Sequence, residues 1–134
     1  MKTRSIRQSR VIPATPEQVY EALVNARKHS AFTGAKATGT ARTGARFTAW
    51  DGYISGKHLE LEKGVRLVQE WSTTEWPADV PPSRLEFSFA PHPKGAKVTM
   101  VQTGVPLEQA DRYTQGWIDH YWVPLTEYFE AKKR

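Results

Sequence analysis

Residues 110–132, with the sequence ADRYTQGWIDHYWVPLTEYFEAK, decide the fold of this chain. As a helix this stretch would be about 34 Å long at about 1.5 Å per residue, which is enough to cross a small domain. On a helical wheel its apolar side chains fill an arc of about 200°, wider than the apolar stripe of an ordinary surface helix. A terminal helix of this kind needs a partner that curves around it.

The apolar arc divides into two stripes. The first is aromatic with polar tips, and the second is mainly hydrocarbon. The first holds Tyr113, Trp117, Tyr121, Pro124 and Tyr128, and the second holds Ile118, Trp122, Leu125 and Phe129. We expect the second stripe to anchor the helix. Buried Tyr and Trp tips normally need a polar partner, so we expect Tyr113, Trp117 and Tyr121 of the first stripe, together with His120, to face an interior space.

Two residues interrupt the helical pattern. Pro124 leaves the carbonyl of His120 without its usual donor and predicts a bend. Gly116 costs about 1 kcal/mol relative to Ala in a helix interior. A close approach by a neighbouring strand or loop would explain the glycine.

Residues 44–103 alternate with the period of two that is typical of β-strands. Asp51-Gly52 between alternating segments is a strong hairpin signal. On this pattern Leu59 and Leu61 share an inner face, and His58 points outward to solvent. The three prolines of residues 75–83 predict a loop.

The first part of the chain predicts a strand over residues 5–12 and then a helix. Thr15, Pro16 and Gln18 form a capping box with proline at the first helical position. Residues 25–30 predict a second short helix or turn. The whole chain is therefore expected to be one α+β domain, residues 1–134. We expect a helix-grip fold, in which a curved antiparallel sheet of about six to seven strands wraps around the long C-terminal helix.

Composition excludes several classes of function. The chain has no cysteine, so it has no disulfide or thiolate chemistry. The net charge of +5 is concentrated at the two ends, and no nucleic-acid-binding motif accompanies it. No apolar run is long enough to span a bilayer, and no signal peptide is evident. We therefore expect a cytoplasmic protein that neither binds nucleic acid nor inserts into a membrane.

Several segments in order resemble the SRPBCC (START-like) superfamily, and within it the branch named for the activator of Hsp90 ATPase. They are residues 12–20 (IPATPEQVY), 51–56 (DGYISG), 59–61 (LEL), 67–71 (LVQEW), 104–106 (GVP) and 116–117 (GW), followed by Tyr121, Pro124, Leu125 and Tyr128. The resemblance implies the helix-grip fold over nearly the whole chain. It also implies binding of bulky apolar ligands, cyclase or dehydratase chemistry in some members, and chaperone contact in the namesake.

The inner face of the sheet and the first helical stripe give the candidate cavity lining. These residues are Phe32, Phe47, Leu59, Leu61, Trp71, Phe87, Phe89, Met100, Gln102, Tyr113, Trp117, His120 and Tyr121. Gln102 is the polar residue on the inner face of the last strand. A buried amide must be paired, so it either orients a polar group of a ligand or bonds a tyrosine hydroxyl of the helix.

The histidines do not form a metal-binding pattern, and no metal or cofactor is expected. His29 and His92 are assigned to turns. No catalytic residue is assigned, and whether the chain is an enzyme stays open. Three functions follow: a module that binds a small apolar molecule, a cyclase or dehydratase with His120 or Tyr113 as acid–base group, and a chaperone-interaction domain. A monomer and a homodimer are equally compatible with the sequence.

Overall fold

The computed structural model describes residues 2–133. Within them the chain forms seven strands, two short helices after the first strand, and a long helical segment at the C-terminal end. In chain order these elements are β1 (Thr3–Ile12), α1 (Pro16–Val24), α2 (Ala26–Thr33), β2 (Thr38–Gly39), β3 (Arg46–Ala49), β4 (Ile54–Glu62), β5 (Arg66–Thr73), β6 (Ser83–His92), β7 (Gly95–Pro106), η1 (Leu107–Gln109), α3 (Ala110–Trp117), η2 (Ile118–Trp122) and α4 (Val123–Lys132).

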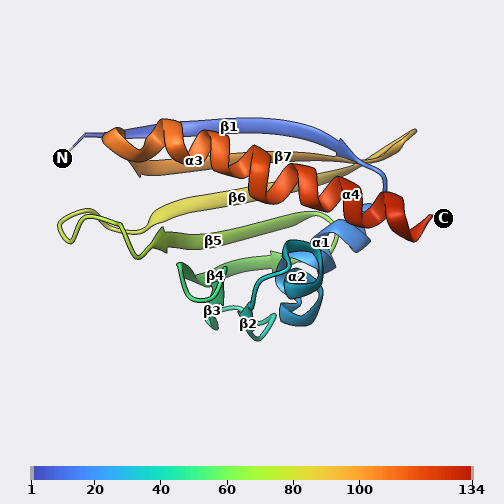
Figure 1. Ribbon diagram of the computed structural model, residues 1–134, viewed down its shortest axis with the longest axis horizontal. Coiled ribbons are helices and arrows are strands. Elements are labelled where there is room, and N and C mark those ends of the chain that lie inside the picture. The colour runs from blue at the N-terminus through green and yellow to red at the C-terminus, as the bar shows by residue number, and fades with distance from the viewer. Residues whose placement is uncertain (1, 134) are drawn as a thin grey trace.

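The strands form one antiparallel sheet in the order β1-β7-β6-β5-β4-β3-β2. Strands β2 to β7 follow one another as a meander, and β1 joins the sheet beside β7. Figure 1 shows the C-terminal helix lying diagonally across one face of the sheet. The helix α2 contacts both α4 and β2 and closes one end of this arrangement. The predicted helix-grip fold is confirmed.

The start of α1 follows the predicted capping box. Thr15 Oγ1 accepts from the backbone N–H of Gln18 at 3.1 Å, and Gln18 Oε1 accepts from the backbone N–H of Thr15 at 2.9 Å. The two bonds satisfy donors that the first turn of a helix leaves free. The second helix, α2, ends at Gly34, whose φ of 80° is the left-handed conformation favoured by glycine.

The C-terminal helix is interrupted by a π-helical turn. The backbone N–H of Val123 bonds to the carbonyl of Ile118, five residues back, and Pro124 lies at the start of α4. A proline cannot donate to the carbonyl four residues before it. The predicted irregularity at Pro124 is therefore present, and it takes the form of a wider turn over Ile118–Trp122.

The predicted orientation of His58 is wrong. His58 pairs with Gln69, Glu60 pairs with Val68, and Leu59 is the extra residue between them. Such a β-bulge reverses the alternation of faces on either side of it. His58 is consequently 2% exposed, whereas Leu59 lies outside the core.

Candidate functional site

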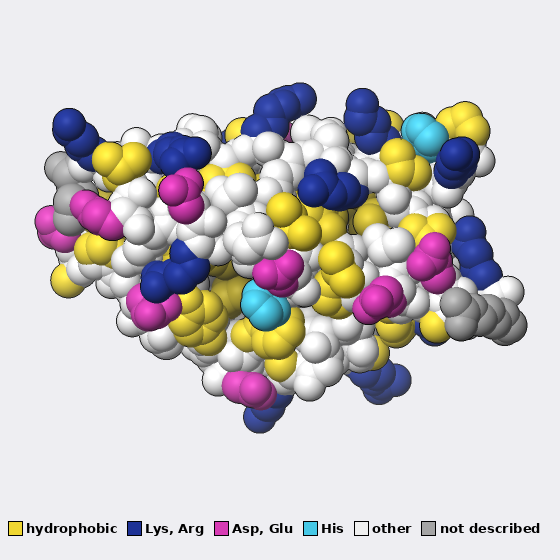
Figure 2. Space-filling model, turned by 45° about the horizontal axis from the view of Figure 1, so that its top comes forward, with side chains coloured by type: hydrophobic (Ala, Val, Ile, Leu, Met, Phe, Trp, Pro, Cys, Tyr) yellow, Lys and Arg dark blue, Asp and Glu magenta, His cyan; other side chains and the backbone are white. Residues whose placement is uncertain are grey.

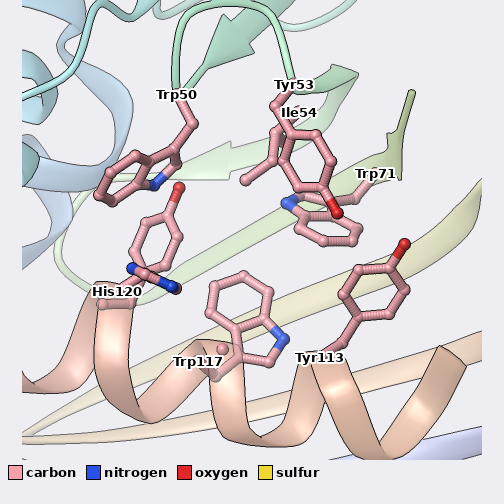
Figure 3. A pocket seen from close by; sticks show the side chains of 9 residues that line it. Trp50, Tyr53, Ile54, Trp71, Tyr113, Trp117 and His120 are labelled. Carbon is pink, nitrogen blue, oxygen red and sulfur yellow. The ribbon is translucent and has the colours of Figure 1, made fainter. Parts of the chain in front are cut away.

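A cavity of about 250 Å³ lies between the sheet and the C-terminal helix (Figure 3). One wall comes from the β3–β4 connection and the strand ends next to it, and the other wall comes from α3 and η2. The lining residues are Trp50, Tyr53, Ile54, Trp71, Tyr113, Gly116, Trp117, His120 and Tyr121. The lining therefore contains no Asp, Glu, Lys or Arg side chain, and most of it is aromatic.

The turn between β3 and β4 places Trp50 over the cavity. The φ angles of Trp50 and Asp51 are 53° and 57°, and the backbone N–H of Gly52 bonds to the carbonyl of Ala49. Positive φ at both central residues is the pattern of a type I′ hairpin turn. This turn forms the first part of the β3–β4 connection. Ala49 pairs with Ile54, so the predicted Asp51-Gly52 pair lies at the centre of the connecting residues 50–53. A bulky residue is rarely found in this conformation, and here it directs an indole toward the interior space.

Gly116 forms part of the helical wall. A Cβ atom at this position would have a single neighbour within 4 Å, His120 Cδ2 at 3.9 Å. The expected close approach of a strand or loop is therefore wrong. The glycine instead keeps the helix surface bare where the helix borders the cavity.

Trp117 is fixed by a buried polar chain. Its indole N–H donates to Gln102 Oε1 at 2.9 Å, Gln102 Nε2 donates to Ser83 Oγ at 3.0 Å, and Ser83 Oγ donates to the carbonyl of Trp71 at 2.7 Å. Of the two predicted roles of Gln102, the bond to a tyrosine hydroxyl is wrong, because its amide bonds Trp117 and Ser83, and contact with a ligand stays a prediction. The amide holds Trp117 through its oxygen and Ser83 through its nitrogen, and it acts on the cavity through the Trp117 indole.

Tyr121 is held by His29 of α2. The His29 Nδ1 atom lies 3.0 Å from the carbonyl of Leu23, and its Nε2 atom lies 3.0 Å from the Tyr121 hydroxyl. Because a carbonyl only accepts, Nδ1 carries the proton of the neutral ring, and Nε2 accepts from Tyr121. Burial lowers the pKa of His29, which favours this neutral form. Burial also raises the pKa of Tyr121, and the nearby Trp50 N–H partly opposes that rise.

The rim of the cavity is fastened to the loop that follows β5. Tyr53 donates to the carboxylate of Glu75, and Arg112 Nη2 lies 3.3 Å from the same carboxylate. Gln109 donates to the Glu75 carbonyl at 2.9 Å and accepts from the Tyr113 hydroxyl at 2.6 Å. Burial, followed by the bond to Glu75, raises the pKa of Tyr53 to about 12. Figure 2 shows hydrophobic side chains gathered around a hollow on this face, with charged side chains dispersed around them.

A second space, of about 30 Å³, lies deeper between the sheet and α2, and it is large enough only for a water molecule. His58 and Gln69 line it, with His58 Nδ1 3.3 Å from Gln69 Nε2. The Phe47 ring stacks on His58 with centroids 5.0 Å apart. Burial lowers the pKa of His58, as it does for His29.

The predicted lining residues fall into three groups. Five of them border the large cavity: Trp71, Tyr113, Trp117, His120 and Tyr121. Phe47 and Phe87 border the small space. The other six, Phe32, Leu59, Leu61, Phe89, Met100 and Gln102, line neither.

Those six have other positions in the fold. Phe32 packs on His29 and Tyr121 behind the cavity wall, and Phe89 packs on Tyr20 of α1. Met100 is fully buried in the core. Leu61 packs at the edge of the core, and Leu59 occupies the bulge.

Trp50, Tyr53 and Ile54 line the cavity but were not predicted to do so. Strict alternation through β3 placed Trp50 on the face opposite Phe47, and only the turn conformation reverses it. His29 was assigned to a turn, yet it lies in α2 and is buried. The sequence signal for Trp50 was its position directly before Asp51-Gly52, because left-handed turn residues redirect their side chains.

The site provides limited acid–base chemistry. His120 is exposed and makes an edge-on contact with Trp50, with ring centroids 5.1 Å apart. Within residues 2–133, no carboxylate is bonded to His120 or to Tyr113. The same residues contain no group of three or more His, Asp or Glu side chains placed to hold a metal ion.

No helix among residues 2–133 has the length and apolar character required to cross a membrane. Residues 2–133 form a helix-grip domain with an aromatic cavity under the C-terminal helix, and the cavity is lined by no Asp, Glu, Lys or Arg side chain.

Comparisons with known proteins agree with the helix-grip fold. The profile of the family described as "Activator of Hsp90 ATPase homolog 1-like protein" matches residues 13–130. The chain belongs to this family. A curated relative, the activator of 90 kDa heat shock protein ATPase homolog of Dictyostelium discoideum, is 28% identical over 116 residues, which are 86% of this chain and 30% of that protein. The chain thus spans about a third of the length of this relative.

Solved structures share the fold. A protein of Mesorhizobium loti, MLL2253, superposes with a TM-score of 0.80 at 23% identity and covers 98% of this chain and 99% of its own. PFC0360w, an HSP90 activator from Plasmodium falciparum, has a TM-score of 0.74 at 19% identity, with coverage of 90% and 91%. At these identities the likeness concerns the fold alone.

Proposed function

We propose that this protein binds a small, uncharged, largely apolar molecule in the cavity between its sheet and its C-terminal helix. The observation that carries the proposal is a cavity of about 250 Å³ whose lining has no charged carboxylate, ammonium or guanidinium group. Ligand pockets in proteins are typically concave and apolar, with a few placed polar groups.

The volume limits the size of the ligand. An apolar cavity of roughly 150 Å³ accepts benzene, and typical drug-sized pockets begin near roughly 300 Å³. The present cavity, at about 250 Å³, therefore suits a molecule with one aromatic ring and a short substituent, or with two fused rings. A long acyl chain or a steroid is too large to be enclosed in this volume.

Gly116 provides a matched pair of variants for the test. Gly116→Leu projects a side chain into the cavity, whereas Gly116→Ala adds a single methyl group in ordinary van der Waals contact with His120. Alanine should also stabilise the helix by up to about 1 kcal/mol. We expect α-methylstyrene, a purely apolar probe, to bind wild type and Gly116→Ala with similar affinity in calorimetry, and to bind Gly116→Leu at least about tenfold more weakly, a difference of roughly 1.4 kcal/mol.

Equal binding of the probe to all three proteins would place it outside the cavity and contradict the proposal. So would the absence of binding to wild type at concentrations up to the solubility of the probe. Thermal unfolding without ligand serves as the folding control for both variants.

A second candidate function is contact with an Hsp90-type chaperone. Family membership and the name of the Dictyostelium relative favour it. Because the chain corresponds to about a third of that relative, it would supply one part of such an activity. The ATPase rate of a purified Hsp90 with and without this chain tests it, and an unchanged rate together with no co-sedimentation would contradict it.

A further inference from the structure

Two polar side chains lie in the core at the small space of about 30 Å³. His58 of β4 and Gln69 of β5 are paired across the sheet, and they are 2% and 6% exposed. The Phe47 ring stacks on the imidazole, and Leu85 also lines the space. A buried polar group is costly unless its hydrogen-bonding atoms have partners, so this pair requires a full account of its donors and acceptors.

The bond between the two side chains leaves part of each without a protein partner. The contact of 3.3 Å between Gln69 Nε2 and His58 Nδ1 is the only side-chain hydrogen bond of either residue within residues 2–133. Because both atoms are nitrogens, the amide donates and the neutral ring carries its proton on Nε2. Burial lowers the pKa of His58, which favours the neutral ring. The His58 Nε2–H group then remains a free donor, and Gln69 Oε1 remains a free acceptor.

Rotating the Gln69 amide by half a turn does not change this balance. Its oxygen would then accept from the Nδ1–H group of His58, and the ring Nε2 would become the free acceptor. The amide N–H groups would become the free donors. In both orientations one residue keeps a donor and the other keeps an acceptor, so a partner that can both donate and accept satisfies the pair.

The free atoms can be reached from the small space. Among residues 2–133, Trp50 Nε1 is the one side-chain nitrogen or oxygen that lacks both a hydrogen-bond partner and surface that a water molecule can touch. The free atoms of His58 and Gln69 therefore keep accessible surface, although both side chains are buried. The small space, which both residues line, provides that access.

The neighbouring polar side chains are engaged elsewhere. His29 bonds through Nδ1 to the Leu23 carbonyl and through Nε2 to the Tyr121 hydroxyl, each at 3.0 Å. The hydroxyl groups of Thr38 and Thr48 bond to each other at 2.6 Å. The missing partner of the His58–Gln69 pair is therefore not supplied by these neighbours.

We propose that the small space is a binding site for one water molecule, held by His58 and Gln69. Water both donates and accepts, and a cavity of roughly 10–15 Å³ is enough to hold it when polar partners are present. The space of about 30 Å³ excludes larger ligands, and its lining has no Asp, Glu, Lys or Arg side chain to hold an ion. This inference is independent of the proposed function, because it does not require a ligand in the large cavity.

A high-resolution crystal structure of the full chain provides the first test. We expect one ordered water at roughly 2.7–3.2 Å from the Gln69 amide and from the free ring nitrogen of His58. A space without ordered density would overturn the proposal. So would a water that contacts neither side chain, or a position of the two side chains in which they satisfy each other directly.

A measurement in solution uses ¹³C-labelled leucine methyl groups. Leu85 lines the small space, whereas Leu125 is fully buried and lines neither space. Nuclear Overhauser effects from water should reach the methyl groups of Leu85 and not those of Leu125. Equal effects at both leucines, or none at Leu85, would contradict a bound water.

Gln69→Met identifies the residue that holds the water, because methionine has a similar length and no amide. We expect the water and its effect at Leu85 to be lost in this variant. His58 keeps its ring N–H there, so the loss would show that the effect in wild type came from water and not from the ring proton. An unchanged effect in Gln69→Met would overturn the assigned role of Gln69. If the variant does not fold, the crystal structure of wild type decides.

Discussion

At the scale of single residues, the cavity is defined by how the local backbone and the hydrogen-bond partners position its lining side chains. Trp50 reaches the interior because its φ is 53°, and Trp117 keeps its place because Gln102 accepts its N–H. Gly116 leaves space for the cavity because it has no side chain. Trp117 could be assigned to the cavity from helical spacing, whereas Trp50 could not, because alternation along a strand does not reveal where a left-handed turn begins.

Two buried histidines make the stability depend on pH. Burial lowers the pKa of both His29 and His58 in the folded protein. The unfolded chain therefore binds more protons than the folded chain between the ordinary value of about 6.5 and the lowered values. Their contribution is constant above that range, and the free energy of unfolding falls as pH decreases through it.

The test compares urea unfolding at about pH 7.5 and about pH 5.5. We expect wild type to lose stability toward the lower pH and His58→Gln to lose less than wild type. His92→Gln, which changes the last residue of β6, outside the core, should behave like wild type. An identical loss in wild type and in His58→Gln would contradict the assignment.

At the scale of elements, the π-helical turn and the β-bulge shift side chains relative to their regular patterns. The long helix, the meander and the capping box follow from spacing and turn chemistry, and the sequence predicted them. The bulge at Leu59 follows from pairing with β5, so a single strand does not reveal it, and the orientation of His58 was missed for that reason. Pro124 predicted an irregular helix. Whether the helix bends there or widens into a π-helical turn depends on the packing of α4.

The π-helical turn predicts that one residue can be deleted from it without loss of the fold. A π-turn contains one residue more than the α-helical path between the same flanking segments. Deleting Asp119, an exposed residue of η2, should convert the turn to α-helix and leave α3 and α4 on their present faces. We expect a loss of about 3 kcal/mol in urea unfolding, because Pro124 would then lie within a regular helix, with altered binding because Tyr121 moves.

Deletion of Gln115 is the matched control, because this exposed residue lies in regular α-helix. Its removal would rotate Trp117 away from Gln102 and should cost at least about 4 kcal/mol or prevent folding. Equal losses from the two deletions would show that η2 does not act as an inserted residue.

At the scale of the whole molecule, a helix with a broad apolar arc lies on an antiparallel sheet, and the larger of the two spaces described above lies beneath α3 and η2. The fold and the family were both predictable, because amphipathic spacing and hairpin signals extend over nearly the whole chain. The size and position of the cavity were not predictable. They depend on which aromatic side chains pack fully in the core and which of them border the cavity. The family match establishes membership, while the cavity's own chemistry supports the proposed ligand.

The positions of the four isoleucines allow the most direct test of ligand binding in the cavity. Ile54 lines the cavity, Ile6 and Ile12 lie in the core, and Ile118 lies on the helix outside the lining. In protein with ¹³C-labelled isoleucine methyl groups, bound α-methylstyrene should give nuclear Overhauser effects to Ile54 alone among the four isoleucines, and these should vanish in Gly116→Leu. Effects to Ile118 without Ile54, or effects that persist unchanged in Gly116→Leu, would contradict binding in this cavity.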